Sequence, residues 1–175
     1  MALIKESDLR EKFGKVITEK SIVGVESYSE DGRYDIFLSH SYLDKVVVIY
    51  IKELFERLGY TVYVDWVDDN QLEREMVCEK TAAILRTRMK SCRCLFFAVS
   101  TNAGHSKWMP WECGYFDGIN GKVAILPITS NDEATYKGQE YLGLYPYIDA
   151  VGDSVYINDP NIYFKFRNLR DWLDE

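Results

Sequence analysis

The chain has 175 residues, of which 47% are hydrophobic, and its formal net charge is −7. This length and composition suit one globular domain with a sizeable core. The negative net charge and the lack of a stripe of basic residues exclude electrostatic binding of nucleic acid, which needs clustered Lys and Arg. No run of about twenty apolar residues predicts a membrane span, and charges interrupt the N-terminus, so we expect a cytoplasmic protein.

The N-terminal part of the chain differs from the rest. Residues 3–19 place apolar side chains at helical spacing between charges, which predicts an amphipathic helix. Residues 27–33 follow as a polar loop. We therefore expect a helix and loop over residues 1–32, which cover a hydrophobic face or gate assembly, and a main domain over residues 33–175.

From residue 34 onward, short apolar runs alternate with helical patterns. Strands are predicted at 34–38, 61–65, 92–100, 123–128 and 154–157, and helices at about 43–58, 73–89, 106–118 and 162–173. An acidic loop is expected at 66–70, whereas residues 136–147 give no single prediction. The alternation predicts an α/β fold: a five-stranded parallel sheet with helices on both faces, in three layers.

The four cysteines are Cys78, Cys92, Cys94 and Cys113, and no two of them have CxxC spacing. We expect buried, reduced thiols. Cys92 and Cys94 are expected on one face of a predicted strand and leave zinc binding open as an alternative, but the chain adds only two histidines. The sequence therefore predicts no metal site.

A carboxylate lies near the start of the helix predicted at 106–118. Pro110 suits a first helical turn, because its missing N–H costs little there. Glu112 follows, where the helix dipole favours an ionised carboxylate, with Trp108 and Tyr115 at helical spacing on either side. The segment alone leaves two interpretations open, a catalytic carboxylate or a simple partner of the helix dipole.

Polar residues gather where the predicted strands end. Ser39, His40 and Ser41 follow the first strand, and residues 65–66 and 100–112 follow two others. Ligands of parallel α/β folds bind at this carboxyl edge. Adjacent Ser and His residues rarely make a catalytic triad, so we expect them to act as hydroxyl and amide donors or as a helix cap.

Three of these segments resemble motifs of the Toll/interleukin-1 receptor (TIR) domain family, in the family's order: residues 34–41 its first conserved box, 59–65 its second strand, and 106–112 the segment with its catalytic glutamate. The likeness covers residues 34–157. Its bacterial form is the nearest match, and single-domain members include TIR proteins of Thoeris anti-phage systems. The resemblance implies a flavodoxin-like fold.

The resemblance also implies cleavage of the nicotinamide–ribose bond of NAD+, which is a substrate, so that no cofactor is expected. Glu112 corresponds to the catalytic carboxylate. Cleavage leaves an oxocarbenium-like ribose that a carboxylate stabilises, while nicotinamide leaves as a neutral group and needs little general acid. The implied substrate-binding residues are Ser39, His40, Ser41, Tyr42, Asp65, Trp66, Trp108 and Trp111.

The implied product is an ADP-ribose-derived immune signal, linear, cyclic or conjugated. Implied partners are a homo-oligomer, a phage-derived activator and a downstream effector, without a membrane or nucleic acid. The chain departs from many TIR sequences in residues 66–72, which lack the proline and glycine of the family's mobile loop. Two other functions stay open: a non-catalytic TIR adaptor, and an enzyme similar to nucleoside deoxyribosyltransferases.

Overall fold

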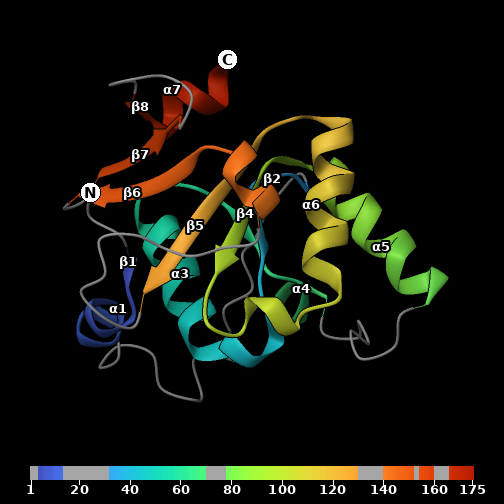
Figure 1. The fold of residues 1–175 in the computed structure, drawn as a ribbon, viewed down its shortest axis with the longest axis horizontal. Helices are drawn as coiled ribbons and strands as arrows, with labels where there is room; N and C mark the ends of the chain where they lie inside the picture. Colours follow the sequence, from blue (N-terminus) through green and yellow to red (C-terminus); the bar gives the residue numbers. More distant parts are fainter. Residues whose placement is uncertain (1–3, 14–31, 70–77, 130–139, 152–153, 160–165) are drawn as a thin grey trace.

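The computed structural model describes residues 4–13, 32–69, 78–129, 140–151, 154–159 and 166–175. Its centre is a twisted sheet with the strand order β3-β2-β4-β5-β6-β7-β8 (Figure 1). The strands are β2 (Tyr34–Ser39), β3 (Val62–Tyr63), β4 (Cys92–Val99), β5 (Val123–Thr129), β6 (Tyr147–Val151), β7 (Ser154–Asn158) and β8 (Phe166–Asn168).

The strands β3-β2-β4-β5-β6 all run parallel to one another. In chain order they follow the 2-1-3-4-5 arrangement of flavodoxin-like folds. The predicted α/β fold with its parallel sheet is therefore confirmed.

The C-terminal strands refine the prediction. A strand does form at 154–157, but β7 pairs antiparallel with β6, and β8 pairs antiparallel with β7. Only two residues separate β6 from β7 in the sequence, too few for the crossover that a parallel pair requires. The fifth parallel strand is β6, which begins where the sequence had given no single prediction.

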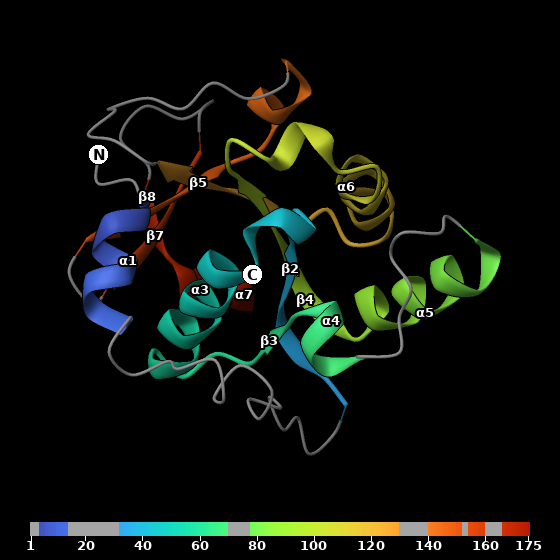
Figure 2. The same ribbon diagram turned by 90° about the horizontal axis from the view of Figure 1, so that it is seen from below.

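Helices cover both faces of the sheet (Figure 2). One face carries α1 (Glu6–Phe13), α3 (Lys45–Arg57) and α7 (Leu169–Asp174), and the other carries α5 (Glu79–Lys90) and α6 (Trp108–Ile119). The side chains of β2, β4 and β5 point to both faces of the sheet and pack against the helices there, so the sheet separates two hydrophobic clusters.

The chain reverses sharply after α3. Gly59 follows the helix with φ at +87°, a left-handed conformation that glycine adopts without a steric penalty. Its N–H donates to the carbonyl of Glu56 at 2.9 Å. The end predicted for this helix at about residue 58 is confirmed, since α3 ends at Arg57 with Leu58 as its C-cap.

A short helix, α4 (Asp65–Asp68), replaces part of the acidic loop expected at 66–70. The Asp68 carboxylate accepts a hydrogen bond from the N–H of Val64 at 2.7 Å, which ties the end of this turn to its start. The fully buried Lys52 of α3 donates to the carbonyl of Val62 at 2.7 Å and lies 3.9 Å from Asp68. These contacts fix the end of β3 and α4 relative to α3.

The N-terminal segment packs on the sheet. Of the helix expected over 3–19, the structure describes Glu6–Phe13. The helix begins later than expected because Ile4–Lys5 form a short strand, β1, which is parallel to the end of β5. Phe13 is fully buried, and its ring lies 6.4 Å from that of Tyr50 in α3. Residues 14–31, including most of the expected polar loop, lie outside the described residues, and the domain division at residue 32 stays a prediction.

The helix predicted at 162–173 corresponds to α7, which begins only at Leu169 because residues 166–168 form β8. Residues 162–165 lie outside the described residues. Residues 73–77, at the start of the helix predicted at 73–89, also lie outside it. Of the helices described, none has the length and apolar character that a membrane crossing requires.

Phe13→Ala tests whether the N-terminal segment belongs to the cooperative fold. Removing a fully buried ring lowers the free energy of unfolding by about 3–5 kcal/mol, and urea denaturation measures the loss. The control Leu144→Ala, at a residue 72% exposed, changes the free energy of unfolding by less than about 0.5 kcal/mol. Equal stability of the two variants would show that α1 unfolds separately from the sheet.

Candidate active site

The carboxyl ends of β2 and β4 form the switch point of the sheet. The chain leaves β2 toward α3 on one face and leaves β4 toward α6 on the opposite face. The two connections diverge at this edge, which is where ligands bind in open α/β sheets. Most of the residues predicted for the site lie at the end of β2, in its connection to α3, or in the first turns of α6.

Ser39 and Glu112 meet at this point from distant parts of the chain. The Ser39 hydroxyl donates a hydrogen bond to Oε2 of Glu112 at 2.6 Å, and both residues are 0% exposed. A short bond of this kind suits a hydroxyl donating to a carboxylate. The structure therefore holds the Glu112 carboxyl group in one orientation against the end of β2.

The start of α6 determines where Glu112 lies. The hydroxyl of Ser106 accepts a hydrogen bond from the N–H of Met109 at 3.3 Å, and Pro110 occupies the first turn as predicted. Glu112 lies one turn after Trp108, which is buried. The ring of Trp108 meets that of Trp111 edge to face at 5.4 Å, and Trp111 stacks on Tyr115 at 5.6 Å. Both indoles line a cavity between α5 and α6.

His40 belongs to a separate cluster. It is fully buried and directly follows Ser39, the last residue of β2, but it contacts other partners. The indole N–H of Trp66 donates to Nε2 of His40 at 2.9 Å, and Nδ1 lies 2.8 Å from the carbonyl of Leu38. Because Trp66 only donates, Nε2 accepts and Nδ1 carries the proton. The buried Asp65 places Oδ1 at 3.6 Å from the same Nε2.

Comparison with known proteins shows the family of the chain. No protein-family model matches the chain. The chain is 51% identical over 157 residues to "Probable 3' cyclic ADP-D-ribose synthase ThsB'" of Bacillus cereus (strain MSX-D12), an alignment that covers 85% of this chain and 80% of that protein. The chain belongs to the ThsB' family of bacterial TIR proteins.

A second relative is similar over a shorter region. "Putative cyclic ADP-D-ribose synthase TIR2" of Cytobacillus dafuensis is 36% identical over 102 residues, which cover 58% of this chain and 26% of that protein. The flavodoxin-like strand order is consistent with a TIR domain.

Two further predicted residues of the TIR domain, Ser41 and Tyr42, lie at the start of the short 3-10 helix Tyr42–Asp44. The hydroxyl of Ser41 accepts a hydrogen bond from the N–H of Leu43 at 3.4 Å, which is the helix-cap role that the sequence left open. Tyr42 is exposed, and the ammonium of Lys45 lies 3.8 Å from its ring centroid and 5.4 Å from that of Trp66. Lys45 thus links the exposed Tyr42 to the His40 cluster.

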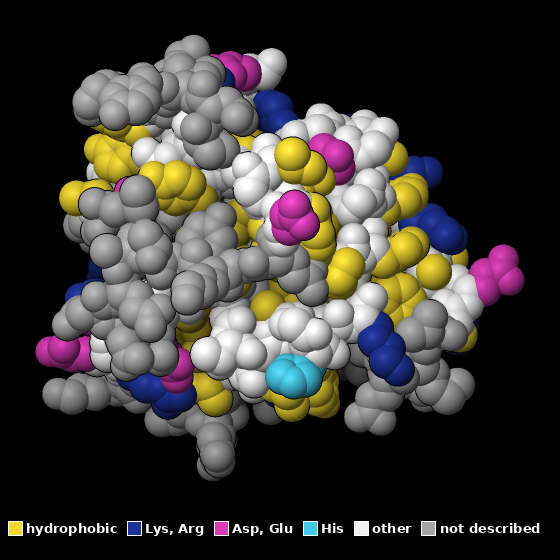
Figure 3. Space-filling model, in the orientation of Figure 1, with side chains coloured by type: hydrophobic (Ala, Val, Ile, Leu, Met, Phe, Trp, Pro, Cys, Tyr) yellow, Lys and Arg dark blue, Asp and Glu magenta, His cyan; other side chains and the backbone are white. Residues whose placement is uncertain are grey.

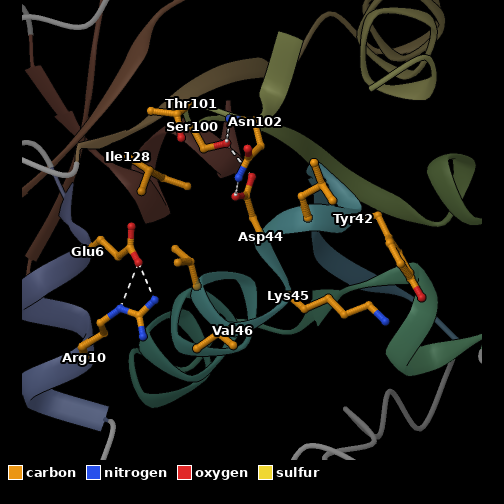
Figure 4. A pocket seen from close by; sticks show the side chains of 12 residues that line it. Glu6, Arg10, Tyr42, Asp44, Lys45, Val46, Ser100, Thr101, Asn102 and Ile128 are labelled. Atoms are coloured by element: carbon orange, nitrogen blue, oxygen red, sulfur yellow. Dashed lines mark hydrogen bonds and ion pairs between the residues drawn. The ribbon is translucent and has the colours of Figure 1, made fainter. Parts of the chain in front are cut away.

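A cavity of about 470 Å³ on the α1 and α3 side of this TIR domain was not anticipated (Figure 4). Asp44 accepts hydrogen bonds from the hydroxyl of Ser100 at 2.5 Å and from the amide of Asn102 at 2.6 Å, which join the two connections across the switch point. Arg10 and Glu6 of α1 form an ion pair at the opposite wall. The sequence did not indicate that Arg10 and Glu6 line a cavity, because it did not predict which part of the domain their helix packs against.

The cysteines of the TIR domain are free thiols. Burial raises the pKa of the thiols of Cys92 and Cys94, and that of Cys113 to about 11, so all three stay protonated near neutral pH. Cys92 and Cys94 pack into different hydrophobic clusters, which corrects the expectation of one shared strand face. In the part of the chain that is described, no three His, Cys, Asp or Glu residues group as metal ligands.

Trp66→Phe tests the His40 cluster. The change removes the indole N–H and leaves Nε2 of the buried His40 without its donor, so the free energy of unfolding falls by about 1–3 kcal/mol in chemical denaturation. Tyr42→Phe is the control, since it removes a hydroxyl from an exposed residue and changes the free energy by less than about 0.5 kcal/mol. Equal losses would contradict a contribution from this hydrogen bond.

Proposed function

We propose that this TIR protein cleaves the nicotinamide–ribose bond of NAD+ and closes the remaining ADP-ribose into a cyclic immune signal in anti-phage defence. The observation that carries the proposal is the 51% identity to a cyclic ADP-D-ribose synthase over 80% of that protein. The second relative carries the same kind of name. The protein is thus an enzyme of the ADP-ribosyl cyclase type.

Glu112 is the proposed catalytic carboxylate. When the bond between C1' of the ribose and the nicotinamide nitrogen breaks, its electron pair neutralises the pyridinium, and positive charge develops on the ribose. A fixed carboxylate beside that ribose stabilises the charge most in the transition state. A nucleophile of the same molecule then attacks C1' and releases its proton, so the products are nicotinamide, a cyclic ADP-ribose and H⁺.

Ser39 is a positioning residue in this proposal. Its hydrogen bond to Oε2 fixes the plane and direction of the Glu112 carboxyl group before substrate binds. A carboxylate that needs no reorientation stabilises charge at less cost than one that has to turn.

The burial of the site supports ring closure over hydrolysis. Ser39 and Glu112 are 0% exposed, and Trp108 beside them is buried. A site that excludes bulk water favours attack on C1' by a group tethered within the substrate. Water competes less as the site closes, so the same residues yield a cyclic product.

The same burial supports control by a partner. With Glu112 completely covered, a dinucleotide reaches it only after neighbouring groups move, and an activator that binds the open state shifts that equilibrium. We propose a phage-derived activator, assembly into a homo-oligomer, and an effector that senses the product. We also propose that the protein acts in the cytoplasm, with NAD+ as substrate and no cofactor.

Two other functions remain to be separated by experiment. A non-catalytic adaptor would use Glu112 only as a partner of the helix dipole, whereas the fixed Ser39–Glu112 pair favours a chemical role. An enzyme similar to nucleoside deoxyribosyltransferases would exchange free bases on nucleosides, and parallel assays with these substrates detect that reaction.

Glu112→Gln tests catalysis. The change keeps the size of the side chain but removes its charge, so nicotinamide release from NAD+ falls by about 10²–10³-fold or more, measured by chromatography with and without an activator. The control is Glu140→Gln, at an exposed residue outside the site, which retains wild-type activity. Equal release by wild type and Glu112→Gln would disprove the role given to Glu112.

Ser39→Ala tests the positioning role. Loss of the hydroxyl leaves one oxygen of the buried Glu112 without this donor, and kcat falls by about 10–100-fold, less than in Glu112→Gln. Ser39→Thr keeps a hydroxyl and recovers part of the activity. A wild-type kcat in Ser39→Ala would contradict the positioning role.

A further inference from the structure

The cavity between α5 and α6 has a volume of about 610 Å³. Pockets of this size hold ligands as large as a nucleotide. Its lining includes Cys78, Glu79, Arg86, Lys107, Trp108 and Trp111. Figure 3 shows hydrophobic side chains next to Lys and Arg side chains on the face over these two helices. The cavity thus combines aromatic surface with positive charge.

The two cations of the cavity are available to a ligand. Among the described residues, no carboxylate lies within ion-pair distance of Arg86 or Lys107, and both side chains are exposed. Arg88 of the same helix differs, since Asp69 binds it through two hydrogen bonds of 2.7 and 2.8 Å. In a chain of net charge −7, two such cations at one cavity favour an anionic ligand.

Aromatic rings hold Arg86 in place. Its guanidinium carbon lies 5.4 Å from the ring centroid of Trp111 and 5.9 Å from that of Tyr115. Stacking of this kind leaves the N–H donors of the guanidinium available. An arginine ordered in this way can form a bidentate pair of hydrogen bonds with phosphate oxygens.

The start of α5 adds to the positive character of the cavity. This helix has 12 residues and begins at Glu79. The positive end of its dipole adds to the attraction for an anion. Glu79 brings a carboxylate to the same wall, which suits a ribose hydroxyl as donor.

We propose that this cavity binds the diphosphate of the dinucleotide substrate, with Arg86 and Lys107 as its ligands. The inference rests on the proposed function, which supplies a substrate with a diphosphate between two nucleosides. Trp108 lines the cavity and lies one helical turn before Glu112, so a diphosphate held here places the attached nicotinamide ribose toward the catalytic carboxylate.

Titration with ADP-ribose tests the cavity without any turnover. Tryptophan fluorescence reports binding, because two indoles line the cavity. Arg86→Gln and Lys107→Gln each raise the Kd for ADP-ribose about tenfold, and the effect shrinks at high salt. The matched control is Lys80→Gln, which makes the same charge change at an exposed residue of α5 outside the cavity and keeps the Kd within about twofold of wild type.

Steady-state kinetics with NAD+ separate binding from chemistry. Arg86→Gln raises KM about tenfold and changes kcat by less than about twofold, because the diphosphate contact is the same in the substrate and in the transition state. Arg86→Lys keeps the charge but not the fork of donors and recovers part of the affinity. Circular dichroism spectra that match wild type show that each variant is folded.

Two results overturn the inference. One is an ADP-ribose affinity in Arg86→Gln and Lys107→Gln equal to that of Lys80→Gln. The other is binding of adenosine that is as tight as that of ADP-ribose, since adenosine lacks the diphosphate. Failure of wild type to release nicotinamide under any activating condition would instead overturn the proposed function, and the titration distinguishes the two because it requires no reaction.

Discussion

A hydrogen bond from Ser39 to Glu112 joins the end of the first parallel strand to the helix that follows the central strand. Neither element places the carboxyl group alone. The end of β2 supplies the donor, the turn at Ser106 and Pro110 starts α6 at the right residue, and the order of β2 and β4 in the sheet brings the two together. Any change that shifts α6 along the sheet therefore changes the site as well.

The sequence predicted elements better than contacts. Ser39 and Glu112 were found because each carries a local signal, an apolar strand in one case and a proline in a first helical turn in the other. The contact of His40 with Trp66 could not be predicted from the sequence, because it depends on the position of α4. The buried Lys52 of α3 helps to fix that position. The strand β1 was missed for the same reason: its pairing with β5 outweighs the helical pattern of its sequence.

Both sides of the switch point carry a cavity, and the two differ in chemistry. On the α1 and α3 side, Asp44, Ser100 and Asn102 hydrogen-bond to one another. On the α6 side, Arg86 lies beside the indole of Trp111 and Lys107 lines the same cavity, and neither has a carboxylate partner among the described residues. The first arrangement already satisfies its polar groups, whereas the second offers charge to a ligand, and Glu112 belongs to the helix of the second.

The outer strands of the sheet affect how copies of this domain can associate. β3 has two residues and β8 has three, so each border offers few unpaired backbone groups for another strand to extend the sheet. Fibre-like addition of strands is disfavoured at such short borders. The homo-oligomer proposed above would therefore form through the side chains of helices and connecting segments, and it could dissociate without breaking a continuous hydrogen-bonded sheet.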